Sequence, residues 1–140
     1  MSETYGLSVE RVSDATAVRL FDAFVGLYDR ERPDWVTASE LDLRPGGRWT
    51  VSFAVPDGDR FTEERVLTEV RPPDRLAYTM TAIFEDGATL DAAVEITIAA
   101  TEPGNRFRLE QHGFPDHQTR DVFAAAWQDV LLEVDRRARR

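Results

Sequence analysis

The sequence contains no cysteine and no lysine, and it has only two histidines. Without cysteine there can be no disulfide, no thiolate metal site and no thiol nucleophile. Without lysine there is no Schiff-base lysine and no lysine phosphate clamp. His112 and His117 lack an evident third metal ligand, and no serine lies in a Gly-x-Ser-x-Gly elbow. We therefore expect no metal, no cofactor and no assigned catalytic residue.

Long apolar runs and a basic excess are also missing. No apolar stretch approaches the ~18 residues that a membrane span needs, and residues 1–5 carry neither the basic start nor the apolar run of a signal peptide. All 17 basic residues are arginine and the net charge is −9, a sign that repels phosphate backbones. We expect a cytoplasmic protein with one domain over residues 1–140, and neither a nucleic acid nor a membrane as partner.

Turn signals punctuate the middle of the chain at nearly even spacing. Proline presets the backbone angle of an early turn position, and glycine accepts the positive angle of a later one. These signals fall at residues 44–47, 56–59, 71–74, 85–87 and 102–105. Apolar and polar residues alternate between them, with the strand period. The clearest case is the stretch with Leu90, Ala92, Val94, Ile96 and Ile98 on one side. Short turns between consecutive strands predict an antiparallel meander.

One long amphipathic segment closes the chain. Asp116 is suited to cap it, and apolar residues recur at steps of three and four. This apolar stripe consists of Phe123, Trp127, Val130, Leu131, Val134 and Ala138. Near the N-terminus, residues 7–12 read as a strand, Ser13 and Asp14 as the cap of a first short helix, and Pro33 as the start of a second. The pattern predicts an α+β fold in which about seven curved antiparallel strands surround the long helix.

Three segments carry a resemblance to a known family: residues 41–49, residues 69–79, and residues 107–114 followed by the helix that contains Trp127. The chain resembles the START-like (SRPBCC) superfamily, with its helix-grip fold, over residues 5–138. Within it, the chain is similar to the bacterial homologues of the activator of heat shock protein 90 ATPase. The resemblance implies a ligand carrier, a polyketide cyclase or a chaperone regulator, and it does not choose among them.

A curved sheet around a single helix tends to leave an apolar pocket between the two. Our leading hypothesis is therefore a protein that binds a small hydrophobic or aromatic molecule. We expect the pocket to be lined by Trp35, Trp49, Phe53, Tyr78, Met80, Gln111, Phe123 and Trp127. Tyr78 and Gln111 stand among apolar neighbours, so they either bond to one another, to backbone or to water, or they orient the ligand.

Two alternatives stay open at this point. A cavity-based enzyme of the cyclase or dehydratase type would need Tyr78 and Gln111 together with one of Glu63, Glu64 or Arg65 as an acid or base. Whichever face that charged strand turns inward, some charged side chain should reach the concave side, where we expect an ion pair at the pocket rim. The other alternative is a chaperone-regulating interaction module. Homodimer formation through a sheet edge or a helix is left undecided.

Overall fold

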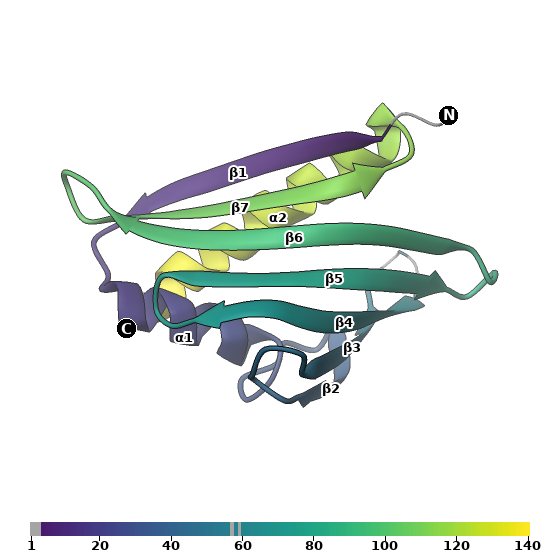
Figure 1. Ribbon diagram of the computed structural model, residues 1–140, viewed down its shortest axis with the longest axis horizontal. Coiled ribbons are helices and arrows are strands. Elements are labelled where there is room, and N and C mark those ends of the chain that lie inside the picture. Colours follow the sequence, from purple (N-terminus) through teal and green to yellow (C-terminus); the bar gives the residue numbers. More distant parts are fainter. Residues whose placement is uncertain (1–3, 57, 59) are drawn as a thin grey trace.

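The computed structural model describes residues 4–56, 58 and 60–140, and across these residues the chain forms seven strands and two helices. The strands are β1 (Tyr5–Ser13), β2 (Val36–Leu41), β3 (Arg48–Ala54), β4 (Arg60–Arg71), β5 (Arg75–Phe84), β6 (Thr89–Ala100) and β7 (Asn105–Phe114). The helices are α1 (Ala17–Leu27) and α2 (His117–Ala138). All neighbouring strands are antiparallel, in the order β1-β7-β6-β5-β4-β3-β2 (Figure 1).

The meander follows the predicted alternation. In β6, the five aliphatic residues of the clearest predicted strand are buried, whereas Asp91 and Glu95 on the other side are exposed. Gly87 and Gly104 occupy predicted turns with φ of 85° and 80°, the left-handed region that glycine enters without a steric penalty. The predicted turn at 56–59 lies partly outside the described residues. The strand period in the sequence thus identifies which face of the sheet meets the core.

The N-terminal part differs from the prediction in three places. The cap of α1 is Thr16 rather than Ser13 or Asp14, because the Ser13 hydroxyl is engaged with Asp135 and with the amide of Ala15. The second short helix is absent from the described residues, which form turns over 28–31 and 34–35. From Pro33 the chain makes a single turn, in which the Val36 amide donates to the Pro33 carbonyl at 3.0 Å, because the chain continues directly into strand β2. The sequence predicts that the meander starts with residues 41–43, but its first strand, β2, already begins at Val36.

Helix α2 crosses one half of the sheet. Asp116 caps it as predicted by accepting a hydrogen bond from the Thr119 amide at 2.7 Å. The stripe from Trp127 to Ala138 is buried, and α2 packs against β1, β7 and α1 (Figure 1). Strands β3 and β4 are not among the elements with extensive α2 contacts, so this half of the concave face is left with less cover. Neither helix combines the length and hydropathy that a membrane crossing requires.

Candidate functional site

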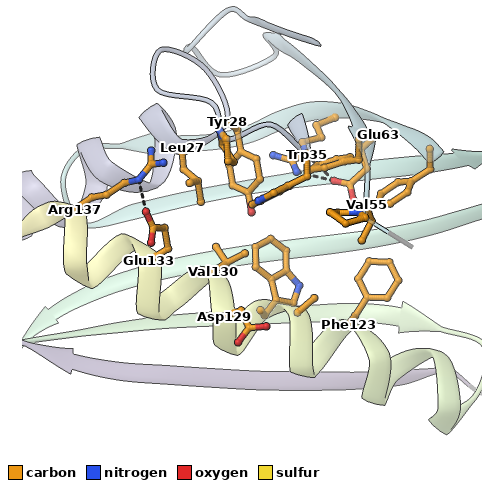
Figure 2. Close-up of a pocket in the computed structure, with 17 residues that line it drawn as sticks. Leu27, Tyr28, Trp35, Val55, Glu63, Phe123, Asp129, Val130, Glu133 and Arg137 are labelled. Atoms are coloured by element: carbon orange, nitrogen blue, oxygen red, sulfur yellow. Dashed lines mark hydrogen bonds and ion pairs between the residues drawn. The ribbon is translucent and has the colours of Figure 1, made fainter. Parts of the chain in front are cut away.

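A pocket of about 550 Å³ lies between α2 and the part of the sheet formed by β3 and β4 (Figure 2). The end of α1 and the following turn segment close one side of it. Six aromatic side chains contribute to its wall: Tyr28, Trp35, Phe53, Phe61, Phe123 and Trp127. The pocket exists because α2 leans towards the β1 edge and a single helix cannot fill the whole concave face of a twisted sheet.

One wall is a stack of three aromatic rings. Phe53 and Phe61 are paired across β3 and β4, which brings their ring centroids to 4.7 Å in a stacked arrangement. Trp35 also stacks with Phe53, with a centroid distance of 6.1 Å and an angle of 13° between the planes. The carbonyl of Trp35 also accepts a hydrogen bond from the Ala54 amide at 2.9 Å. The turn before β2 is therefore anchored to the sheet, and its indole forms a flat surface of the pocket.

An arginine on α2 secures the opposite side. The Nη1 atom of Arg137 donates to the backbone carbonyl of Glu31 at 2.7 Å, and its Nε atom donates to Glu133 at 2.8 Å. Hydrogen bonds from Arg136 and Arg137 lower the pKa of Glu133 to about 2, so this carboxylate stays ionised at neutral pH. The turn segment after α1 is thus connected to α2 by one guanidinium group.

The floor of the pocket carries a buried ion pair. Glu63 and Arg65 point to the same side of β4, and their side chains are 6% and 1% exposed. The Nε and Nη2 atoms of Arg65 lie 2.9 Å and 2.7 Å from the same oxygen, Oε1 of Glu63. We predicted an ion pair at the pocket rim, formed across strands. The structure instead places the pair inside one strand and removes it from water.

Three aromatic rings surround the guanidinium group of Arg65. Its Cζ atom lies 4.4 Å from the ring centroid of Trp49, 4.8 Å from that of Tyr78 and 4.9 Å from that of Tyr28, which are cation–π distances. Burial by itself lowers the pKa of Arg65, but Tyr78, Glu63 and Tyr28 outweigh it, so the net pKa is raised and the group stays charged. Burial also raises the pKa of both tyrosines, which keeps their phenols neutral.

The structure brings only half of the predicted lining together at the pocket. Trp35, Phe53, Phe123 and Trp127 line it. The other four predicted residues do not, and each is buried within the core: Trp49, Tyr78, Met80 and Gln111. The reason is that sequence parity identifies the inward face of a strand but not the part of that face which α2 leaves open. Ligand binding by any of these residues stays a prediction.

The two buried polar residues have different surroundings. The Oε1 atom of Gln111 accepts a hydrogen bond from the Trp127 indole at 2.6 Å, so it connects β7 to α2. The hydroxyl of Tyr78 is buried without a hydrogen-bond partner among the described residues, as are Nε2 of Gln111 and Nε1 of Trp49. Tyr78 lies against Arg65 and contacts its charge through the ring face. Neither Tyr78 nor Gln111 reaches the pocket wall.

Sequence reasoning left open which face of β4 points inward. Val66 is 42% exposed, and the inward residues before it are Phe61, Glu63 and Arg65. A register shift between Leu67 and Glu69 changes the side to which later residues point. The period-two spacing from Phe61 to Leu67 was the available signal, and the two charged residues within it obscured that signal.

Metal binding finds no support in the described residues. No three histidine, aspartate or glutamate side chains converge there as metal ligands do. His112 is exposed on the outer face, with its Nε2 atom 3.8 Å from Oε2 of Glu110. His117 lies in the first turn of α2 and packs edge-on against Tyr5 with a centroid distance of 4.1 Å.

Comparison with known proteins agrees with this architecture. A family model described as "Activator of Hsp90 ATPase homolog 1-like protein" matches residues 14–136. A search of curated protein sequences found no match.

Solved structures share the fold at low sequence identity. An uncharacterized protein from Rhizobium leguminosarum is 19% identical, with a TM-score of 0.78 over 99% of this chain and 97% of that one. A protein from Chromobacterium violaceum is 25% identical, with a TM-score of 0.73 over 93% and 94% of the two chains. Ara h 8.0201 is 14% identical, with a TM-score of 0.76 over 97% and 98%. The common architecture is the helix-grip fold of the START-like (SRPBCC) superfamily.

Proposed function

This chain belongs to the family of Activator of Hsp90 ATPase homolog 1-like proteins, and we propose that it binds a small apolar or aromatic molecule in the pocket between α2 and strands β3 and β4. The observation that carries this proposal is a pocket of about 550 Å³ with six aromatic side chains in its wall. Pockets for small ligands typically span about 300–1,000 Å³ and are mostly apolar with a few polar groups.

The arrangement of the wall supports a flat ligand. Phe53 is stacked with both Trp35 and Phe61, and Trp127 contributes from α2. Aromatic rings prefer offset-stacked or edge-to-face contacts, and each such pair adds about 0.5–1.5 kcal/mol beyond area burial. Burial of the ligand's apolar surface would provide the main driving force, at about 25 cal/mol per Å² before ordering costs.

A catalytic alternative has less support. A cyclase or dehydratase needs at least two polar groups that converge on the substrate. Of the predicted candidates, Tyr78 and Gln111 do not line the pocket, and the Gln111 oxygen is engaged by Trp127. Glu63 and Arg65 do line it, but they are paired with one another. No observation favours chaperone regulation over ligand binding, so we advance binding alone.

Ala126 permits a direct test of the proposal. It lies on the pocket wall and is exposed, so Ala126→Phe would fill the pocket without disturbing the core. The neighbouring Ala125 is also exposed on α2 and does not line the pocket, so Ala125→Phe is the matched control.

The readout is tryptophan fluorescence, because Trp35 and Trp127 both line the pocket. Titration with a panel of sterols, fatty acids, flavonoids and polyketides should change the emission of the wild-type protein. Ala126→Phe should weaken this response at least tenfold, and Ala125→Phe should retain it. A panel without any response, or equal responses from the two variants, would contradict binding at this site.

A further inference from the structure

The Glu63–Arg65 pair leaves one carboxylate oxygen free. A guanidinium group often binds a carboxylate through two parallel hydrogen bonds, one to each oxygen. Here the Nε atom of Arg65 donates to Oε1 of Glu63 and its Nη2 atom makes the ion-pair contact with that same oxygen, while within the described part of the chain Oε2 has no hydrogen-bond partner. An ionised carboxylate has about four acceptor positions, so Glu63 retains unused acceptor capacity.

Glu63 is the more exposed member of the pair. Both residues line the pocket, but the Arg65 side chain is 1% exposed and packs against Trp49, Tyr78 and Tyr28, and its Nη1 atom is buried without a hydrogen-bond partner among the described residues. The Glu63 side chain is 6% exposed and belongs to the pocket wall. Figure 2 shows its carboxylate at the end of the pocket away from Arg137, and Trp35 and Val55 line the same pocket.

The other charges in the wall are also unfavourable for an anion. Asp129 and Glu133 contribute two more carboxylates from α2. The only other guanidinium that lines the described pocket, that of Arg137, is already engaged by Glu133 and by a backbone carbonyl. The whole chain carries a net charge of −9. An acidic ligand would therefore meet three carboxylates and no accessible, unpaired cation.

We propose that Glu63 selects the ligand by accepting a hydrogen bond through its free oxygen, so that the pocket takes an apolar ring bearing a hydroxyl or amine donor and discriminates against carboxylic acids. This inference rests on the proposed function and adds the chemical class of the ligand. Trp35, Phe53 and Phe61 pack against the ring of the ligand, and Glu63 accepts a hydrogen bond from the polar substituent at the edge of that ring.

A series of ligands on one ring tests the selection. Affinities of the wild-type protein for 2-methylnaphthalene, 2-naphthol, 2-(aminomethyl)naphthalene and 2-naphthoate would be measured by isothermal titration calorimetry at pH 7. A hydrogen bond to a charged group should make at least one of the two donor ligands about tenfold or more tighter than the methyl compound. The naphthoate should bind most weakly. Whether the alcohol or the amine gains more identifies the kind of donor.

The outcomes separate the two proposals. Equal affinities for the methyl and both donor compounds, or a naphthoate that binds as tightly as the better donor, would overturn the role of Glu63 while ligand binding stands. A protein that binds none of these compounds and none of the broader panel would instead overturn the proposed function.

A double variant addresses Glu63 itself. Glu63→Gln alone would leave the charge of Arg65 buried and unpaired, which is strongly destabilising. Replacement of a whole buried pair by apolar side chains is often neutral for stability, so the test is Glu63→Leu combined with Arg65→Met. The control is Glu10→Gln with Arg106→Gln, an exposed pair at 3.5 Å with the same change of charge.

We expect the donor preference to fall to a ratio near one in the Glu63→Leu, Arg65→Met protein and to persist in the control. Circular dichroism establishes that each variant is folded. A donor preference that survives in the folded pocket variant would overturn the assignment, and the ligand series on the wild-type protein tests it even where the variant does not fold.

Discussion

The indole nitrogen of Trp127 donates a hydrogen bond of 2.6 Å to the side-chain oxygen of Gln111, and this contact joins α2 to β7 beneath the pocket. Gln111 is fully buried, so its oxygen has no water to replace the indole. One face of Trp127 is part of the pocket wall, while its nitrogen is fixed by the sheet. The same residue thus belongs to the core and to the candidate binding site.

Replacing one partner of this hydrogen bond should lower the free energy of unfolding more than replacing both partners. Trp127→Phe keeps an aromatic ring but leaves the Gln111 oxygen unsatisfied, so we expect a loss of about 1–3 kcal/mol in the free energy of unfolding. Gln111→Leu combined with Trp127→Phe removes the buried acceptor as well and should recover part of that loss. Urea unfolding followed by circular dichroism measures both, and strictly additive single effects would contradict the coupling.

Stability should fall in acid through Glu133. Its pKa is about 2 in the folded protein against an ordinary value of 4.5, because Arg136 and Arg137 hydrogen-bond to the ionised form. A carboxyl group whose pKa is lower in the folded than in the unfolded protein stabilises the fold fully at pH values above its pKa in the unfolded protein. This stabilisation is lost as the pH falls towards its pKa in the folded protein. The free energy of unfolding should therefore decrease between pH of about 4.5 and 2.

The matched comparison uses Glu133→Gln and Glu102→Gln, which make the same change of charge. Glu102 is exposed in a turn and forms no ion pair among the described residues. Thermal unfolding from pH 2 to pH 7 should show a flatter decline for Glu133→Gln than for Glu102→Gln. Identical pH profiles would contradict the assignment.

Arg137 should control the opening of the turn segment after α1. Arg137→Ala removes the hydrogen bond to the Glu31 carbonyl, so amides over residues 28–36 should exchange faster with deuterium while β6 and β7 stay protected. Arg136→Ala is the control, because Arg136 also binds Glu133 but makes no hydrogen bond to this segment. Faster exchange in both variants would point to Glu133 rather than to the contact with Glu31.

Two glycines with the same backbone conformation should differ in their tolerance of alanine. Gly87 and Gly104 both have positive φ, so each alanine variant pays about 1 kcal/mol for the left-handed region. A Cβ atom at Gly104 would lie 2.2 Å from the Ser13 carbonyl oxygen, whereas one at Gly87 meets nothing within 4 Å. Gly104→Ala should therefore lose about 1–3 kcal/mol more than Gly87→Ala in chemical unfolding. Equal losses would contradict the close approach.

Most of the fold could be predicted from patterns among residues that are close together in the sequence. The alternation around Val94, the turn glycines and the stripe around Val134 each depend on neighbours in the chain, and they predicted the sheet and α2 correctly. The candidate site was less accessible. Met80 satisfies the inward parity that Phe53 also satisfies, yet only Phe53 reaches the pocket, because α2 lies over one half of the sheet and not the other.

The sequence by itself determined the strand period, the turn positions, the capped final helix and the negative charge, since each is a property of residues close together in the chain. The tertiary structure alone decided that Glu63 and Arg65 are buried, which of their atoms remain free, and which aromatic rings surround them. Tyr28 and Tyr78 come from distant parts of the chain, and only packing brings their rings to one guanidinium group. That packing turns two charged residues of an otherwise polar strand into the most specific feature of the pocket.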